Sequence, residues 1–595
     1  MFHSSHRRSC VGSSTLRTPS RLWPLLLLCC LCSAALRAET DLPVRVELSG
    51  IDTTARDNIL ATLTIAQQGD RALSPARVRL LHRRAGQQII DALRPLGYYR
   101  ATVDGAVERD ARQWQARYRI TPGAPLPIGQ VDLRFTGAAE QDEAMLRLQR
   151  ELPLKSGEPL RHDQYEAAKK QIQRLAAERG YFTARFTRHQ VRVDLDRYQA
   201  DIQLWFDSGP RHRLGPVRFS DSRISPELLR RYLRQAPGTP YRQSALLRLQ
   251  ERLVDSGYFS QVEVVAQPER AQNDEVPVEV KLFDRKPDRF QIGAGYGTDT
   301  GARMRGSYEY QPINPQGHRF DSEAVLSQLN QKIDARHLIP LARPDRDQFI
   351  THAGWENDQP PNDSESAAFK FGVGVQQGLG QWRRLIGLDY QSERFQIGDE
   401  EGLSQLLMPT LGLTRTQADH PIHVTHGNSL QLSLRGSIEG TLSDATFVQA
   451  SLKGKRIDPL GEGRLLSRLE LGSSWVDEFD QLPPSVRFFA GGDQSVRGHD
   501  YKALGPEDAD GEVLGGKHLL VGSVEYEHPF NDDWRGAIFI DAGNAFDRFD
   551  QPLHRGVGLG LRWKLPVGWV RIDLAHPHPF AEGGWRLHFT MGPDL

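Results

Sequence analysis

The stretch GGDQSVRGHDYKALGP, residues 491–506, separates two segments in which apolar and polar residues alternate. It is too polar, too rich in glycine and too irregular to be a strand itself. Its glycines, Gly491, Gly492, Gly498 and Gly505, allow backbone with φ > 0, where other residues clash. The stretch is therefore predicted to be a loop that folds back on itself.

Arg497 is the candidate functional residue of this loop, and it lies between Val496 and Gly498. A guanidinium held in a fixed loop presents a rigid fork of N–H donors that is best matched by a carboxylate. The segment FIDAG, residues 539–543, offers Asp541 as that partner. The alternative is a solvated surface loop in which the arginine has no special role.

Residues 287–595 contain repeated segments in which apolar residues alternate with Gly, Ser, Gln or charged residues, such as Val557, Leu559, Leu561 and Trp563. This pattern is typical of transmembrane β-barrels, which must close because hydrocarbon cannot satisfy an open sheet edge. At ~9–11 residues per crossing plus connections, the region is long enough for about 16 antiparallel strands. A soluble β-sandwich is the alternative.

Three repeats precede this region. Gly-Tyr-Tyr at residue 97, Gly-Tyr-Phe at residue 180 and Gly-Tyr-Phe at residue 257 each follow a helical pattern and precede a strand pattern. The period is too long for common solenoids and predicts three α+β domains of order β-α-α-β-β. We expect these domains to span residues 39–124, 125–209 and 210–286. Their open sheet edges favour the binding of extended peptides or partners.

Residues 1–38 are predicted to be a secretory signal peptide, because arginines precede an apolar run that ends in small residues. All four cysteines lie in this segment, so the exported chain is expected to contain no disulfide. Acidic and basic residues are equal in number, at 75 each, which does not favour a nucleic-acid partner.

The motifs VRG, LGP and FxDxG together resemble the BamA/TamA-type outer-membrane assembly barrels. In that family the loop enters the barrel lumen and its arginine pairs with an aspartate of the wall. The resemblance implies these roles for Arg497 and Asp541, with Gly505, Pro506 and Gly543 in the accompanying motifs. His499 stands where the family usually has Phe or Tyr. Three POTRA-like repeats and the segments 570–579 and 592–595 make the chain most similar to the TamA branch.

The resemblance implies an outer-membrane barrel with periplasmic repeats that inserts autotransporters and other β-barrel proteins. It also implies a TamB-like partner anchored in the inner membrane, unfolded outer-membrane proteins as clients, and contact with outer-membrane lipid. Two alternatives stay open: the outer-membrane end of a phospholipid bridge between the two membranes, and a two-partner secretion pore.

The first and last strands of the barrel are expected to meet at a weak seam through which a client strand enters. Both are rich in glycine, which weakens strand interiors. The residues that mark this seam are Phe290, Tyr296, Gly583, Gly584, Trp585 and Phe589.

No catalytic, cofactor or metal site is expected, and the protein is not predicted to be an enzyme. Residues 511–518 copy most of a phosphate-binding loop but end in His518 and lead into a strand pattern. His576 and His578 have no third ligand at a suitable spacing. The serine-nucleophile motif GxSxG does not occur in the sequence.

Overall fold

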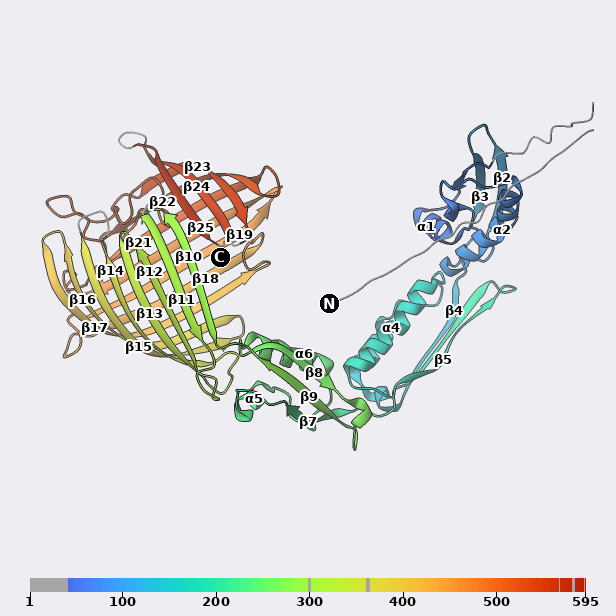
Figure 1. Cartoon of the computed structure of the whole chain (residues 1–595), viewed down its shortest axis with the longest axis horizontal. Coiled ribbons are helices and arrows are strands. Elements are labelled where there is room, and N and C mark those ends of the chain that lie inside the picture. Colours follow the sequence, from blue (N-terminus) through green and yellow to red (C-terminus); the bar gives the residue numbers. More distant parts are fainter. Residues whose placement is uncertain are drawn as a thin grey trace, which may run out of the picture. The chain divides into compact units, whose positions relative to one another are not determined.

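The structure is a computed structural model of the chain (Figure 1). It describes residues 41–297, 301–359, 364–566, 568–579, 584–592 and 594. The predicted signal peptide, residues 1–38, and Gly583 of the predicted seam lie outside the described residues.

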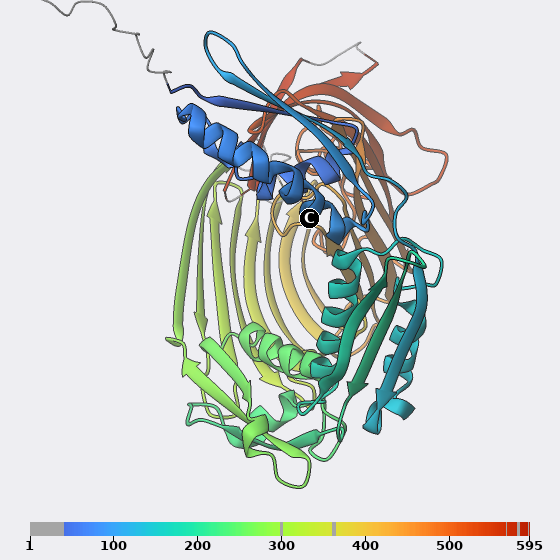
Figure 2. The same ribbon diagram turned by 90° about the vertical axis from the view of Figure 1, so that its right-hand side faces the viewer.

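The first domain consists of a three-stranded sheet and two helices. Its elements are β1 (Val44–Ser49), α1 (Thr53–Thr62), η1 (Ala66–Gln68), α2 (Pro75–Leu93), η2 (Arg94–Leu96), β2 (Thr102–Arg109) and β3 (Trp114–Thr121). The sheet order is β1-β3-β2, with β1 parallel and β2 antiparallel to β3. Helix α2 lies alongside these strands in Figure 2.

The next two domains repeat this order. The second contains β4 (Ile128–Thr136), η3 (Gly137–Gln141), α3 (Glu143–Glu151), α4 (His162–Glu178), β5 (Arg185–Asp194) and β6 (Gln199–Asp207). The third contains β7 (Arg213–Phe219), α5 (Pro226–Tyr232), α6 (Gln243–Asp255), β8 (Phe259–Ala266), η4 (Pro268–Arg270) and β9 (Glu275–Asp284). Their sheet orders are β4-β6-β5 and β7-β9-β8. The predicted β-α-α-β-β order is confirmed in all three domains.

The helices pack through apolar stripes. In α2, Val78, Leu81, Ala85 and Ile89 recur every three or four residues and are buried in the core of the first domain. None of the helices in the described parts of the chain is long and apolar enough to cross a membrane.

A left-handed glycine precedes the aromatic pair of each repeat. Gly97, Gly180 and Gly257 have φ values of 92°, 83° and 79°. An L side chain is strained in that region, whereas glycine turns the chain out of the preceding helical segment without steric strain. The glycine-aromatic signature that marked the repeats therefore marks the end of each helical pair.

Asp142 organises the turn between η3 and α3 in the second domain. Its Oδ2 accepts hydrogen bonds from Arg179 Nε at 2.6 Å and Tyr181 Oη at 2.8 Å, and its Oδ1 accepts from Ala144 N at 3.0 Å. Burial disfavours the charged carboxylate, but the bonds from Arg179 and Tyr181 outweigh this and lower the pKa of Asp142.

Sixteen antiparallel strands follow in strict sequence order. They are β10 (Asp288–Gly297), β11 (Gly301–Tyr310), β12 (Arg319–Ser327), β13 (Asn330–Pro340), β14 (Gln348–Asp358), β15 (Glu365–Leu379), β16 (Trp382–Ile397), β17 (Glu400–Ala418), β18 (Gly427–Ser437), β19 (Phe447–Leu460), β20 (Gly463–Val476), β21 (His518–Pro529), β22 (Trp534–Phe546), β23 (His554–Leu565), β24 (Gly568–His578) and β25 (Arg586–Gly592). One continuous sheet of sixteen strands excludes the β-sandwich alternative. The strands curve around a common interior in Figure 2.

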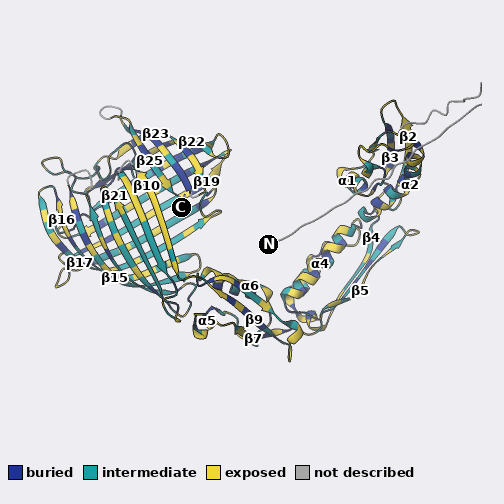
Figure 3. Cartoon of the chain, viewed as in Figure 1, coloured by how far each residue is buried: buried dark blue, intermediate teal, exposed yellow. Residues whose placement is uncertain are grey.

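The barrel has apolar residues outside and charged residues inside. On β23, Leu559 is 61% exposed while Arg562 is fully buried. On β22, Ile538 and Ile540 are exposed, whereas Asp541, the residue after Ile540, is buried. Exposed and less exposed residues alternate along the barrel strands in Figure 3. This distribution of apolar and charged residues is the reverse of that in a soluble protein. It matches a sheet that faces lipid on its outer side.

The barrel is nearly closed. Strands β10 and β25 stand at the two ends of the strand order, and within the described residues no hydrogen-bonded ladder joins them. Some of their Cα atoms nevertheless approach to within 8 Å. The first and last strands are therefore neighbours in space that do not form a regular pair.

Candidate functional site in the barrel lumen

Arg497 lies inside the barrel, in the long connection between β20 and β21, and only 5% of it is exposed. Its Nε donates to Asp541 Oδ2 at 2.7 Å, its Nη2 to Asp541 Oδ1 at 3.0 Å, and its backbone N to Asp541 Oδ2 at 3.1 Å. The predicted partners thus meet through a two-pronged ion pair, in which both N–H donors of the fork face one carboxylate.

Two further carboxylates contact the same guanidinium. Arg497 Nη1 donates to Glu525 Oε2 at 2.7 Å and to Asp573 Oδ2 at 3.1 Å. The guanidinium carbon also lies 3.4 Å from the centre of the Phe539 ring. Because the acids come from β21, β22 and β24, one loop residue connects three wall strands.

The wall adds two buried arginines. Arg562 on β23 bonds Glu525 Oε1 at 2.6 Å and Asp573 Oδ1 at 2.6 Å. Arg464 on β20 bonds Glu527 Oε2 at 2.7 Å, and Glu527 Oε1 lies 3.3 Å from Arg562 Nε. Shared carboxylates therefore link Arg497 to Arg464. Burying so many charges is tolerated because each one faces an opposite charge.

Sequence reasoning missed these additional members, Glu525, Glu527, Arg562, Asp573 and Arg464. A signal was present, because Glu525 and Glu527 are two apart and so share one face of β21. Arg562 likewise lies between the outward-facing Leu561 and Trp563. Which strands would meet at Arg497 was not visible in the sequence.

The loop glycines take the predicted conformation at three of four positions. Gly491, Gly492 and Gly498 have φ values of 100°, 101° and 95°. Gly505 was predicted wrongly, because its φ is not in the left-handed region. A Cβ at Gly505 would lie 2.9 Å from Val513 Cγ1, so close packing explains the glycine there.

The other predicted loop residues have packing roles. Val496 is fully buried against Ala490, Leu504 and Val521. The Pro506 carbonyl accepts from Leu514 N at 2.9 Å.

Two positions outside the loop depend on a close approach of backbone. Gly543 lies on β22, where a Cβ would come within 2.6 Å of the Leu520 carbonyl oxygen. On β23, a Cβ at Gly556 would overlap the carbonyl oxygen of Arg497. The loop thus lies directly on the wall at a position where only glycine fits.

His499, which replaces the family's aromatic residue, stays beside β23. Its Nε2 lies 3.3 Å from the Arg555 carbonyl oxygen, and its ring packs edge-on against His554 at 5.5 Å. The substitution therefore leaves the contacts of Arg497 intact.

The loop also contacts the last strand. Gly498 N donates to His588 Nε2 at 3.0 Å, and His588 Nδ1 lies 2.5 Å from Asp493 Oδ1. Arg586 forms an ion pair with Asp500. Because His588 and Arg586 both belong to β25, the loop holds the final strand as well as the wall. The sequence did not predict this contact.

Asp594, which follows β25, is buried in the wall. Its carboxylate accepts from Arg464 Nη1 at 2.6 Å, Arg571 Nη2 at 2.9 Å, Trp569 Nε1 at 3.1 Å and Val424 N at 2.9 Å. Asp594 is thereby held against β20, β24 and the turn between β17 and β18.

The described seam residues lie on β10 and on or just before β25. Phe290 and Tyr296 on β10 are 71% and 55% exposed, and Trp585, just before β25, is 58% exposed. Gly584 is exposed before β25, and Phe589 is half-buried within it. The seam therefore has apolar groups on its outer side, as a lipid-facing surface requires.

No group of three or more potential metal ligands occurs in the described parts of the chain. His576 packs instead against Trp585, with ring centres 5.1 Å apart. The absence of enzymatic activity stays a prediction.

Comparison with known proteins finds matches for the three repeats and for most of the barrel. Residues 351–594 match the Omp85 superfamily domain. Residues 45–122 match the POTRA domain described as TamA domain 1, and residues 128–208 and 212–283 match the POTRA family described as surface antigen variable number repeat.

Similar proteins include two outer membrane protein assembly factors named BamA. The BamA of Nitratidesulfovibrio vulgaris is 23% identical over 394 residues, which cover 61% of this chain and 48% of the relative. The BamA of Neisseria meningitidis serogroup B is 27% identical over 514 residues, which cover 72% of this chain and 62% of the relative. The chain thus spans about half to three fifths of the length of these relatives.

Among solved structures, BamA from Haemophilus ducreyi lacking POTRA domains 1–3 superposes with a TM-score of 0.67 at 18% identity, covering 78% of this chain and 99% of that one. At this identity the likeness concerns the fold. The chain carries three POTRA-type domains followed by an Omp85 superfamily barrel, and it is homologous to BamA.

Proposed function

We propose that this protein inserts β-barrel proteins, autotransporters among them, into the outer membrane through the seam between β10 and β25. The POTRA domains then lie in the periplasm and receive unfolded clients. The observation that carries the proposal is that, among the described residues, no ladder joins β10 to β25 in a sheet whose other neighbours are all paired.

The physical reason is the unpaired backbone at the seam. A strand that enters hydrocarbon must satisfy its N–H and C=O groups within the protein, because lipid offers no partners. The edges of β10 and β25 present such groups to an incoming strand, which can pair with them before its own barrel closes.

A TamB-like protein anchored in the inner membrane is the proposed partner. The match of residues 45–122 to the POTRA domain described as TamA domain 1 supports this choice. The sheet of that domain has β1 and β2 at its edges, and an extended segment of a partner can add to either edge.

Disulfide trapping tests the seam. The sequence has no cysteine beyond residue 32, so introduced cysteines react only with each other once the predicted signal peptide has been removed. A panel that pairs one cysteine in residues 289–293 with one in residues 587–591 identifies a pair that oxidises in the folded barrel. We expect oxidation of this pair to stop insertion of an autotransporter client and reduction to restore it.

The matched control is a disulfide within an existing ladder. Leu559 and Leu574 are direct partners on β23 and β24 and both face outward. Locking Leu559→Cys to Leu574→Cys should leave insertion unchanged. Insertion that continues at full rate with the seam locked would overturn the proposal, and a phospholipid bridge or a secretion pore would then explain the barrel.

A further inference from the structure

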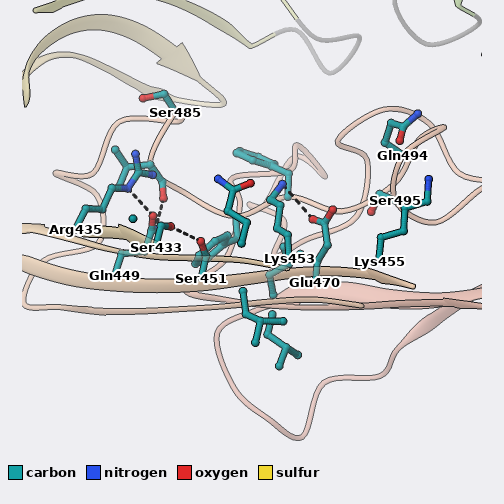
Figure 4. A pocket seen from close by; sticks show the side chains of 18 of the residues that line it. Ser433, Arg435, Gln449, Ser451, Lys453, Lys455, Glu470, Ser485, Gln494 and Ser495 are labelled. Atoms are coloured by element: carbon teal, nitrogen blue, oxygen red, sulfur yellow. Dashed lines mark hydrogen bonds and ion pairs between the residues drawn. The ribbon is translucent and has the colours of Figure 1, made fainter. Parts of the chain in front are cut away.

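A cavity of about 1070 Å³ lies in the barrel lumen. Its lining comes from the inner faces of neighbouring strands, chiefly β16 to β20, and from residues 484–502 of the long connection. Figure 4 shows Arg435, Lys453 and Lys455 on one side of this space and Gln494 and Ser495 on the other. The ion-pair network around Arg497 lies outside this lining.

Positive charge predominates in the lining, which contains eight Lys and Arg side chains and three Asp and Glu side chains. Four of the cations have carboxylate partners: Lys453 with Glu470, Arg487 with Glu400, Lys502 with Asp358 and Arg571 with Asp594. The other four lining cations form no ion pair within the described residues. They are Arg303, Arg383, Arg435 and Lys455.

Neutral partners position two of these cations without cancelling their charge. Arg435 Nε donates to Gln449 Oε1 at 2.8 Å, which leaves the rest of its fork toward the cavity (Figure 4). Lys455 Nζ donates to the backbone carbonyl of Asp594. Cations held in a hollow with low-dielectric walls focus a positive potential and concentrate anions there.

The cavity also offers neutral donors beside the cations. Ser433 and Ser451 share a hydrogen bond of 2.6 Å, and their neighbours in the lining include Ser485, Gln494 and Ser495. Hydroxyl and amide groups together with Arg and Lys suit the several oxygens of a phosphate group. An acidic peptide fits less well, because β16 to β20 are paired on both sides and offer no free strand edge.

We propose that this cavity binds an elongated anion that carries more than one phosphate group. Gln449, opposite Arg435, and Lys455 are six residues apart on β19, which is roughly 20 Å along a strand. A single phosphate cannot contact both ends, so separate phosphates contact Arg435 at one end and Lys455 at the other. The inference does not depend on whether the seam opens.

Calorimetric titration of the detergent-solubilised full chain with tripolyphosphate and with a longer linear polyphosphate tests the site. We expect the longer polyphosphate to bind more tightly, and Arg435→Gln with Lys455→Gln to weaken its binding by about tenfold or more. Higher salt should weaken it further, since the attraction is between charges.

The matched control removes the same charge elsewhere in the barrel. Arg336→Gln with Arg394→Gln changes two arginines that do not line the cavity, and binding should stay within about twofold of the unchanged chain. If the first pair of changes prevents folding, Arg303→Gln with Arg383→Gln tests the other two lining cations without an ion pair.

Two probes distinguish the source of the phosphate. Micelles doped with cardiolipin, which has two phosphates, are compared with micelles doped with phosphatidylcholine. Displacement of polyphosphate by cardiolipin alone identifies a lipid ligand, whereas displacement by neither identifies a soluble one. Equal loss of binding in the control variant, or equally tight binding of polyglutamate, overturns the proposal.

Discussion

Gly498 N donates a hydrogen bond to His588 Nε2 at 3.0 Å, and this bond joins the loop that carries Arg497 to the last strand of the barrel. Arg497 itself is bound to Asp541, Glu525 and Asp573 on the wall. The loop therefore lies between the fixed wall and the strand that forms one side of the seam. Through these contacts the loop links the position of β25 to that of the wall strands β21, β22 and β24.

Arg497→Ala should strongly destabilise the barrel. The change leaves Asp541, Glu525 and Asp573 with fewer positive partners, and loss of one member of a buried ion pair costs about 3–5 kcal/mol. Asp541→Ala should act in the same direction. Urea unfolding of the detergent-folded barrel measures both effects, and client insertion should fall in parallel. Wild-type stability and insertion in both variants would contradict the bracing role of this pair.

His588→Ala should loosen β25 without unfolding the barrel. It removes the bonds to Gly498 and Asp493, and one buried hydrogen bond contributes about 1 kcal/mol. Amide hydrogen exchange in residues 586–592 should then accelerate by roughly fivefold. The amides of β22 provide the internal control. Unchanged exchange in β25 would mean that its ladder with β24 alone holds the strand.

Asp594→Ala should destabilise the barrel by about 3 kcal/mol, because Arg464 and Arg571 lose a buried carboxylate. Arg464 keeps Glu527, so the loss should be smaller than for Arg497→Ala. Asp550→Ala is the control, since the side chains of Asp550 and its partner Arg548 are both exposed and such a pair contributes little. Equal urea midpoints for the two variants would argue against a structural role for the buried carboxylate.

The second POTRA-type domain should lose stability in acid through Asp142. Its pKa is lowered on folding, so its contribution is present above the unfolded pKa, about 3.9, and is lost as the pH falls through the lower folded value. Calorimetry of the full chain at pH 7, 5, 4 and 3 should show a destabilisation by Asp142→Asn that shrinks below about pH 4. A difference that is constant with pH would exclude this ionisation as its source.

Local patterns were sufficient to predict much of this protein. The spacing of Val78, Leu81, Ala85 and Ile89 depends only on helical periodicity, and the alternation of Leu559, Leu561 and Trp563 depends only on the two-residue period of a strand. Both patterns express burial on one face of one element. The three repeats, the sixteen strands and the pairing of Arg497 with Asp541 followed from them together with recognisable motifs.

Only the tertiary structure showed which residues become partners across the lumen. The sequence shows Glu525, Arg562 and Asp573 only as polar residues on the inner face of a strand. The alternation along one strand does not predict which strands meet at Arg497. The same holds for His588 beside Gly498 and for Asp594 beside Arg464. Ion pairs and hydrogen bonds require atoms within about 3 Å, and closure of the barrel brings together residues that are distant in sequence.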